Sequence, residues 1–301
     1  MTSQGLKVYK INELKNSNSI KELVEIDSEI SSKNRTNVKV NFNINQRNKI
    51  AEKIFNKRNE FKIIVLGNQK SGTSAIAHLL AEYGQLNKTI DIPNLLNNNK
   101  LKDGILESKY FSNTLIKEPT LTFFYEDLLK KYPIANYIFI VRHPLDNIRS
   151  ILDRVNIAPD KLPLSTEYVK NSNIKDAWKD ICLDSLNINE YNTLTENLVH
   201  RWRRAVKTYL ENKQNFYLVK YEDFNNDKIK TIKNLGSKIG ISEKADISNI
   251  INLQFQPKGS NREKNINELF SKQIINKVES ICKEEMFNLE YEFYGEKNNI
   301  D

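Results

Sequence analysis

Short apolar runs, each followed by a polar turn and then an amphipathic stretch, recur along most of this chain. Residues 63–66 are all aliphatic and end at Gly67, a pattern typical of a buried strand. The apolar residues between positions 75 and 80 follow the spacing of one helix face, and Gly84 is the expected stop. This first unit is therefore predicted to be a strand, a loop and a helix.

Three further runs indicate strands. Residues 137–141 are continuously apolar, as expected for a strand in the interior of a parallel sheet. Residues 115 and 116 indicate a strand that ends at residues 117–119, and residues 216–221 alternate as in a half-buried strand. With helical patterns between them, these runs predict an α/β fold in which helices flank a central parallel sheet.

The chain of 301 residues has room for one large α/β domain or two small ones. Its chemically informative motifs are spread over roughly 200 residues, which favours one domain over residues 61–295. Residues 1–60 are polar and rich in Asn, Lys and Ser, so they are predicted to form an extension with one weak amphipathic helix at 19–30.

The loop within FKIIVLGNQKSGTS, residues 61–74, has the composition of a phosphate-binding loop. Gly67 and Gly72 have the separation of a nucleotide-triphosphate P-loop, but Thr73 stands where that motif has its lysine. The lysine of this chain, Lys70, lies inside the loop instead. A helix beginning here directs free N–H groups at the loop, which predicts an anionic ligand. The displaced lysine indicates chemistry other than magnesium-dependent phosphoryl transfer.

A second motif occupies NYIFIVRHPLDNIRSILDR, residues 136–154. Arg142 follows the apolar run, and open α/β sheets bind ligands at the carboxyl ends of their strands. A magnesium NTPase would place an acidic metal ligand near such a position. An arginine suits a phosphate group, which its planar fork can bind in a bidentate manner. The alternative is that Arg142 only pairs with a surface carboxylate.

Together these motifs resemble those of the sulfotransferases, which use 3′-phosphoadenosine 5′-phosphosulfate (PAPS). The loop K-S-G-T-S at 70–74 resembles the family's site for the 5′-phosphosulfate. Arg142 and Ser150 have the spacing of the arginine and serine that bind the 3′-phosphate. FYLVKYEDF at 216–224, preceded by a helical pattern with Trp202, resembles a third family element. The resemblance spans about residues 61–262, with the motifs in family order, and implies a P-loop-like nucleotide-binding fold.

The resemblance implies a reaction in which fixed donors stabilise charge on the leaving phosphate. The expected donors are the Lys70 ammonium, the N–H groups of Ser71 to Ser74, and the hydroxyls of Thr73 and Ser74. No metal is expected. Glu118 is the expected general base and Lys117 a second contact to the sulfuryl group, with Glu107 and His143 as alternative bases.

The nucleoside end of the site departs from the family. Ala75 occupies a position where many members carry a tryptophan that stacks on adenine. Tyr221 is expected either to contact the adenine or to belong to the core. PKGSNREK, residues 257–264, resembles an R-K-G loop that clasps the 3′-phosphate. There the matching residues are Lys258 and Gly259, and Arg262 is expected to compensate for the missing arginine.

The acceptor side is less informative. The polar segment 155–195, with Pro159 and Pro163, occupies a position that often covers the acceptor pocket in sulfotransferases. A small-molecule or glycan acceptor with a hydroxyl or amine is expected. The net charge is +8, but the lysines are dispersed, which favours a field for an anionic donor over nucleic-acid binding.

Two widely separated cysteines, Cys182 and Cys282, indicate a reducing compartment. With no signal peptide or apolar run of membrane-spanning length, a cytoplasmic enzyme without membrane insertion is expected. Two alternatives stay open: a P-loop kinase or NTPase, and a protein of the same fold that binds a nucleotide without turnover. The sequence does not indicate an oligomeric state.

Overall fold

The structure is a computed structural model that describes residues 62–189, 191–255, 259, 261 and 264–295. The helix expected at 19–30 and the residues Lys258 and Arg262 lie outside the described residues.

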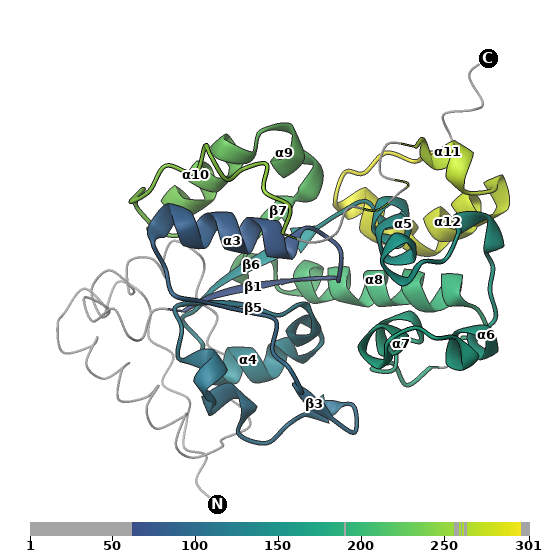
Figure 1. The fold of residues 1–301 in the computed structure, drawn as a ribbon, viewed down its shortest axis with the longest axis horizontal. Helices are drawn as coiled ribbons and strands as arrows, with labels where there is room; N and C mark the ends of the chain where they lie inside the picture. Colours follow the sequence, from purple (N-terminus) through teal and green to yellow (C-terminus); the bar gives the residue numbers. More distant parts are fainter. Residues whose placement is uncertain (1–61, 190, 256–258, 260, 262–263, 296–301) are drawn as a thin grey trace, which may run out of the picture.

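A five-stranded, fully parallel sheet forms the centre of the molecule (Figure 1). The strand order is β2-β5-β1-β6-β7, so the strand that precedes the glycine loop is central. The five strands are β2 (Lys88–Ile90), β5 (Leu115–Lys117), β1 (Ile63–Gly67), β6 (Asn136–Val141) and β7 (Phe216–Lys220).

Burial explains why the two central strands are continuously apolar. Every residue of β1 and β6 is buried, because helices cover both faces of the sheet. In register, Gly67 pairs with Ile140 and Val65 pairs with Lys117. The carboxyl ends of β1, β5 and β6 therefore meet at one edge, which brings the three predicted motifs together.

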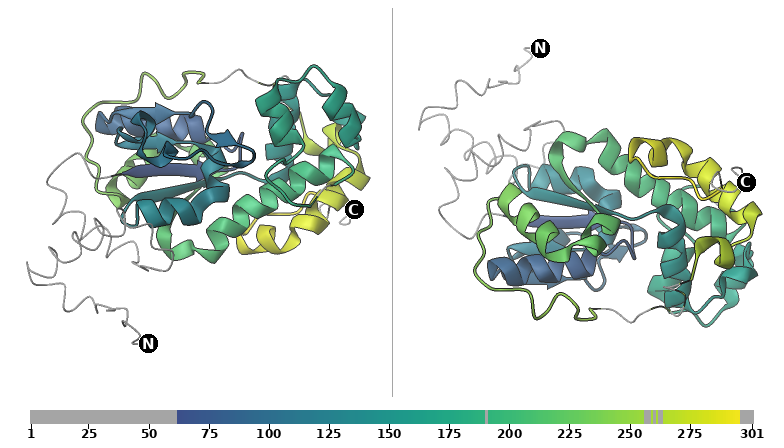
Figure 2. Two further views of the ribbon diagram at one scale, coloured as in Figure 1. Left: turned by 90° about the horizontal axis from the view of Figure 1, so that it is seen from below. Right: turned by 90° about the horizontal axis from the view of Figure 1, so that it is seen from above.

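Helices and short connecting elements surround the sheet. On one face, α3, α9 and α10 pack against residues such as Ile63 and Val65; on the other, α4 and α8 pack against Ile64 and Phe139. Beyond the carboxyl edge, five helices form a helical lobe together with the amino-terminal part of α8 (Figure 2). They are α5, α6, α7, α11 and α12. The α-helices are α3 (Thr73–Gly84), α4 (Tyr125–Lys131), α5 (Pro144–Val155), α6 (Thr166–Asn171), α7 (Asp176–Cys182), α8 (Leu194–Glu211), α9 (Tyr221–Asn226), α10 (Lys228–Lys238), α11 (Ile266–Leu269) and α12 (Lys272–Asn288). The smaller elements are the hairpin β3 (Leu96–Asn97) and β4 (Lys100–Leu101), and the 3₁₀ turns η2 (Ile105–Glu107), η3 (Lys109–Phe111), η4 (Pro119–Phe124), η5 (Pro159–Lys161) and η6 (Lys213–Asn215).

The predicted α/β class, the parallel sheet and its flanking helices are confirmed, with two local differences. Tyr221 begins α9 instead of ending the preceding strand. The segment 155–195 contains η5 and α6, which were not predicted. Within the described part of the chain, no helix is both long and apolar enough to cross a membrane.

The carboxyl end of β6 is anchored to α8 by Trp202. This tryptophan is fully buried, and its indole N–H donates to the carbonyl oxygen of Arg142 at 2.9 Å. A buried indole needs a partner for its N–H. This hydrogen bond fixes the backbone at the point where β6 turns into α5, and so fixes the direction of Arg142.

Candidate active site

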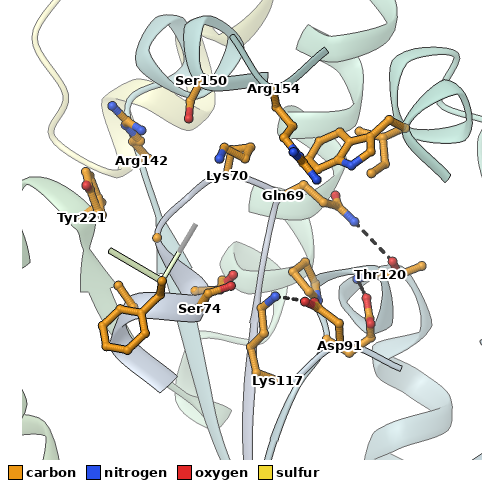
Figure 3. Close-up of a pocket in the computed structure, with 18 of the residues that line it drawn as sticks. Gln69, Lys70, Ser74, Asp91, Lys117, Thr120, Arg142, Ser150, Arg154 and Tyr221 are labelled. Atoms are coloured by element: carbon orange, nitrogen blue, oxygen red, sulfur yellow. Dashed lines mark hydrogen bonds and ion pairs between the residues drawn. The ribbon is translucent and has the colours of Figure 1, made fainter. Parts of the chain in front are cut away.

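A cavity of about 1200 Å³ opens at the carboxyl edge of the sheet, between the glycine loop and the helical lobe. It exceeds the roughly 300–1,000 Å³ of a pocket for one drug-sized ligand, so it can accommodate two molecules side by side. Figure 3 shows Arg142, Ser150, Lys70 and Arg154 on one side and Ser74, Lys117 and Asp91 on the other. Of the predicted site residues, those that line the cavity are Lys70, Gly72, Thr73, Ser74, Lys117, Glu118, Arg142, Ser150, Tyr221 and Gly259.

The glycine loop has a backbone that requires its glycines. Gly67 and Gly72 have φ values of 143° and 94°, and Lys70 itself is left-handed at 66°. A Cβ on Gly67 would lie 2.3 Å from the carbonyl oxygen of Ile140, and one on Gly72 would lie 2.2 Å from the Tyr221 ring. Helix α3 starts directly after Gly72, and no side chain caps its first N–H groups. These amides therefore suit an anion in the cavity, as predicted.

Buried amides hold the loop from behind. Asn147 of α5 donates to the Gln69 carbonyl oxygen at 2.8 Å and to the Ser71 hydroxyl at 3.0 Å, and accepts from the Asn68 amide at 2.9 Å. All of these groups are buried. Ser71, which was predicted to contact the ligand, therefore has its hydroxyl engaged in the support of the loop, while Lys70 lines the cavity.

A second buried network reaches the loop from α8. Arg201 donates through Nε and Nη2 to the Gln69 side-chain oxygen at 3.2 and 3.0 Å, and through Nη1 to Asp184 at 2.9 Å. The side chains of Arg201 and Asp184 are 2% and 0% exposed, so their ion pair is fully desolvated. Asp184 belongs to the segment 155–195. One buried chain of polar contacts thus connects that segment to the residue before Lys70.

The environment of Lys70 lowers its pKa to about 8. Burial of the ammonium group is the main cause, followed by the positive charges of Arg154 and Arg142. A bound anion would offset both the burial of the Lys70 ammonium and its repulsion by the two arginines, so this environment favours anion binding. The site is therefore electrostatically prepared for a polyanionic ligand.

Arg142 lies where a phosphate could replace its weak protein partner. Its guanidinium carbon is 4.7 Å from the centroid of the Tyr221 ring, and Nη2 is 3.7 Å from Asp146. Asp146 is bound more closely by Arg149 and by the Tyr294 hydroxyl, the latter at 3.1 Å. Ser150, one helical turn after Asp146, lies on the same cavity wall as Arg142 (Figure 3). Arg142 and Ser150 are thus brought together as predicted.

His143 and Glu107, the two alternative bases, do not line the cavity. The His143 ring packs against the rings of Tyr291 and Tyr294, and Nε2 lies 3.1 Å from the Glu292 carbonyl oxygen. Its burial lowers the pKa to about 4. Glu107 forms an ion pair with Lys131 at 2.8 Å. His143 therefore shapes the turn before α5, and Glu107 lies away from the reacting groups.

Glu118 lines the cavity, but both of its carboxylate oxygens already accept backbone hydrogen bonds. Oε2 accepts from Ile92 N–H at 2.9 Å, and Oε1 accepts from Thr120 N–H at 3.0 Å, which caps the turn η4. Burial raises the pKa of Glu118, while these hydrogen bonds oppose the rise. The geometry gives this carboxylate a structural function at the end of β5, in addition to its place in the cavity wall.

Asp91 was not recognised from the sequence, yet it lines the same wall. It follows β2 and pairs with Lys117 Nζ at 2.5 Å; the Lys117 side chain is 3% exposed and that of Asp91 is 60% exposed. Its position after a short, partly polar strand gave no indication in the sequence. Lys117 is therefore positioned by Asp91, whose carboxylate is also open to the cavity (Figure 3).

Aromatic side chains gather at the opposite end of the cavity, near Gly72. Tyr221 and Phe224 come from α9, and Phe255 stacks on His78 with ring centroids 4.6 Å apart. Phe255 was not predicted as a site residue, yet it presents an aromatic ring to the cavity. Ala75, which stands at the sequence position of the tryptophan found in many sulfotransferases, lines the same cavity. Gly259 is close enough to α5 that a Cβ would lie 1.9 Å from Asp153.

Among the residues that the structure describes, no three histidine, cysteine or acidic side chains gather in a way that could hold a metal ion. The expectation of a metal-free reaction stays a prediction.

A parallel sheet whose central strand leads through a glycine loop into a helix, with an arginine at the end of the next strand, defines an anion-binding α/β protein. The sulfotransferase family model matches residues 93–245, just over half of the chain. The chain belongs to this family and is a sulfotransferase, so the resemblance stated from the motifs is confirmed. Sulfotransferases typically use PAPS.

Comparison with solved structures identifies several sulfotransferases of low sequence identity. A sulfotransferase from Alicyclobacillus acidocaldarius is 13% identical, with a TM-score of 0.48 over 77% of this chain and 96% of that one. A mouse sulfotransferase complexed with PAP is 17% identical, with a TM-score of 0.44 over 76% and 85%. One from Mycobacterium avium is 13% identical, with a TM-score of 0.46 over 84% and 83%. A search of curated proteins found no match.

Proposed function

We propose that this sulfotransferase moves a sulfuryl group from PAPS to a hydroxyl or amine of a small-molecule or glycan acceptor, by metal-free in-line transfer. One observation carries the proposal. The glycine loop with Lys70 and the pair Arg142 and Ser150 line a single cavity large enough for two ligands. Two separate anion sites on one wall match a donor that carries phosphate at two positions.

The loop would hold the 5′-phosphosulfate, and Arg142 with Ser150 would hold the 3′-phosphate. The N–H groups at the start of α3 supply fixed donors, and the hydroxyls of Thr73 and Ser74 lie beside them. Tyr221, Phe224 and Phe255 offer aromatic faces for the base. We also assign Lys258, Gly259 and Arg262 to the clasp around the 3′-phosphate, of which Gly259 is within the described residues and lies against α5.

When bound, PAPS supplies an activated sulfuryl group whose departure leaves negative charge on a phosphate. Lys70 would stabilise that charge, and its ammonium needs to be protonated to do so. Lys117 would contact the transferring group from the opposite wall. Its burial and its ion pair with Asp91 hold it in one orientation, which supports this assignment.

Two carboxylates are candidates for the base that takes the acceptor proton. Glu118 is the one predicted from the sequence, and its raised pKa suits a proton acceptor. Asp91 is favoured because its side chain is exposed to the cavity. Its carboxylate pairs with the Lys117 ammonium, whereas both oxygens of Glu118 accept hydrogen bonds from backbone N–H groups. Glu118→Gln and Asp91→Asn separate the two, because loss of the true base lowers kcat by roughly 10²–10⁴-fold at unchanged PAP affinity.

The test of the proposed function is a calorimetric titration with 3′,5′-adenosine bisphosphate (PAP), ATP and 5′-AMP, with EDTA or with magnesium. Tight binding of PAP in EDTA supports the proposal and leads to an acceptor screen with PAPS. A preference for magnesium–ATP would support a kinase or NTPase instead. PAP binding without turnover of any acceptor would support a nucleotide-binding protein of the same fold.

Domain organisation and cellular location are also part of the proposal. One domain over residues 61–295 is supported by the five-stranded central sheet, to which the described helices attach directly or through the helical lobe. A cytoplasmic location is supported by Cys182 and Cys282, which are both free and buried. Dispersed lysines support the expectation that nucleic acid is not a partner.

A further inference from the structure

The part of the cavity that faces α7 combines apolar side chains with the guanidinium of Arg154. Arg154 lies at the end of α5, one helical turn after Ser150, and Figure 3 shows it directed into the cavity between Lys70 and Gln69. Beside Arg154, the apolar lining from α7 and the turn that follows it consists of Trp178, Ile181 and Leu186. The segment after β2 adds apolar lining to the cavity at Ile92, Leu95 and Leu96.

Arg154 is held on an aromatic platform. Its guanidinium carbon lies 5.4 Å from the ring centroid of Trp178, the tryptophan of α7. A cation over an indole ring is attracted by the negative face of the ring, which favours this position of the guanidinium. The guanidinium has five N–H donors and this contact uses none of them, so they are available to a ligand. The pair therefore has the form of a preorganised site for an oxyanion.

The other charged side chains of this region already have partners. Asp91 pairs with Lys117, Asp153 accepts from the Asn261 amide at 2.8 Å, and Asp180 is hydrogen-bonded to Ser185. The cations Arg149 and Arg201 pair with Asp146 and Asp184. Among the described residues, Arg154 has no ion-pair partner, although it lines the cavity.

We propose that Arg154, placed over the Trp178 ring, binds an oxyanion of the acceptor, so that the acceptors of this enzyme are anionic molecules with an apolar body. The anion would be of the carboxylate or phosphate type, which an arginine fork recognises in a bidentate manner. This inference rests on the proposed function, because it takes the wall of Arg142 and Ser150 as the side that holds the donor.

Arg154 lies at the far end of the wall from Arg142, beside Lys70. Arg142 and Ser150 come first along the wall, and Lys70 and then Arg154 follow (Figure 3). Arg154 in turn contacts the ring of Trp178. The apolar residues around Trp178 suit the body of an organic acceptor. An anion held there would place the rest of the acceptor across the cavity, toward the wall of Asp91 and Lys117.

The test compares acceptor analogues on the protein–PAP complex by calorimetry. Each of two hydroxyl scaffolds, one phenolic and one aliphatic, is used as its carboxylate, its phosphate monoester and its uncharged amide. For at least one scaffold, an anionic form should bind roughly tenfold more tightly than the amide, as expected for a charge-assisted hydrogen-bonded pair. Arg154→Gln should bring this ratio close to one, and Arg154→Lys should retain part of it.

The control variant is Lys161→Gln, which removes one exposed positive charge from the nearby turn η5 and should leave the ratio unchanged. The proposal is overturned if neither scaffold prefers an anion, or if the preference survives in Arg154→Gln. Loss of PAP affinity in Arg154→Gln would instead assign this arginine to the donor. A prior PAP titration of the unmodified protein keeps failure of the proposed function distinct from failure of this inference.

Discussion

The two halves of the cavity differ in how their charged side chains are held. On the half that we propose to hold PAPS, called the donor half, the loop that carries Lys70 is fixed by buried groups from α5 and α8, and Arg142 is fixed by Trp202 at its carbonyl oxygen. On the half that we propose to hold the acceptor, called the acceptor half, Arg154 and Asp180 are exposed, and their surroundings come from short helices and loops. The donor half is therefore formed mainly by the carboxyl ends of the strands, whereas the acceptor half is formed by short elements that lie beyond them.

This difference follows from what each half has to recognise. Sulfotransferases typically share one donor, PAPS, so the donor half can be built into the strand ends that define the fold. An acceptor pocket changes with its substrate and lies on variable loops. The contact between the halves is the buried pair of Asp184 and Arg201, which passes from the acceptor segment to Gln69 in the loop.

The largest expected effect concerns this connection. Asp184→Asn leaves the Arg201 charge buried without its carboxylate, and breaking such a pair typically costs about 3–5 kcal/mol of unfolding free energy. The measurement is urea unfolding followed by circular dichroism. The control is Asp160→Asn, an exposed position of the same segment, for which a change within about 0.5 kcal/mol is expected. Equal stability of the two variants would show that the halves are not held together by this pair.

The next effect concerns the donor half alone. Lys70→Met removes the cation expected at the leaving phosphate, and loss of one such donor typically lowers kcat by roughly 10²–10³-fold. PAP affinity should fall much less, because the amides at the start of α3 are unchanged. Steady-state kinetics with PAPS and calorimetry with PAP measure the two quantities. Lys161→Met, at an exposed lysine, is the control, and near-normal turnover of the Lys70 variant would remove Lys70 from the chemistry.

The donor half was largely predictable from the sequence because its geometry is local. Gly67 and Gly72 mark a loop between an apolar run and a helical pattern, and the eight-residue separation of Arg142 and Ser150 follows from a strand end and one helix. Parallel strands place such ends at one edge. The sequence therefore predicts which residues meet there.

The network behind the loop and the acceptor half were not predictable in the same way. Arg201 reaches Gln69 across 132 positions, and its partner Asp184 sits in a segment with no clear pattern. Asp91 follows a three-residue strand and is recognised only once Lys117 is seen beside it. The place of Glu118 in the cavity wall was predictable from its position at a strand end, but the two backbone hydrogen bonds that occupy its oxygens were not. Contacts between distant segments depend on tertiary packing, which periodicity does not report.

A smaller effect should distinguish the two anion sites within the donor half. Arg142→Gln should weaken PAP binding by roughly 10- to 150-fold, the value of a hydrogen bond to a charged group. The affinity for 5′-AMP, which lacks the 3′-phosphate, should be nearly unchanged. Calorimetry with both ligands provides the comparison, and Arg142→Lys shows how much depends on the planar fork. Equal losses for PAP and 5′-AMP would mean that Arg142 does not bind the 3′-phosphate.

The smallest expected effect is the uptake of protons by Lys70 when PAP binds. The pKa of Lys70 is about 8, below its ordinary value of 10.5. Between these values the unfolded chain binds more protons than the folded protein, so this group makes the ligand-free protein more stable as pH rises through that window. A bound anion favours the charged lysine and raises its pKa again. PAP binding at about pH 9 should therefore take up protons, whereas at pH 7 Lys70 is already protonated and should contribute none.

Calorimetry in two buffers of different ionisation enthalpy measures this uptake directly. The uptake at about pH 9 should disappear in Lys70→Met, because the phosphates of PAP do not titrate there and no other group replaces the lysine. Arg154→Gln should reduce the uptake, since the second largest cause of the lowered pKa is the charge of Arg154, and its loss brings Lys70 closer to its ordinary value before the ligand arrives. An uptake that Arg154→Gln leaves unchanged would mean that the two halves of the cavity are electrostatically independent.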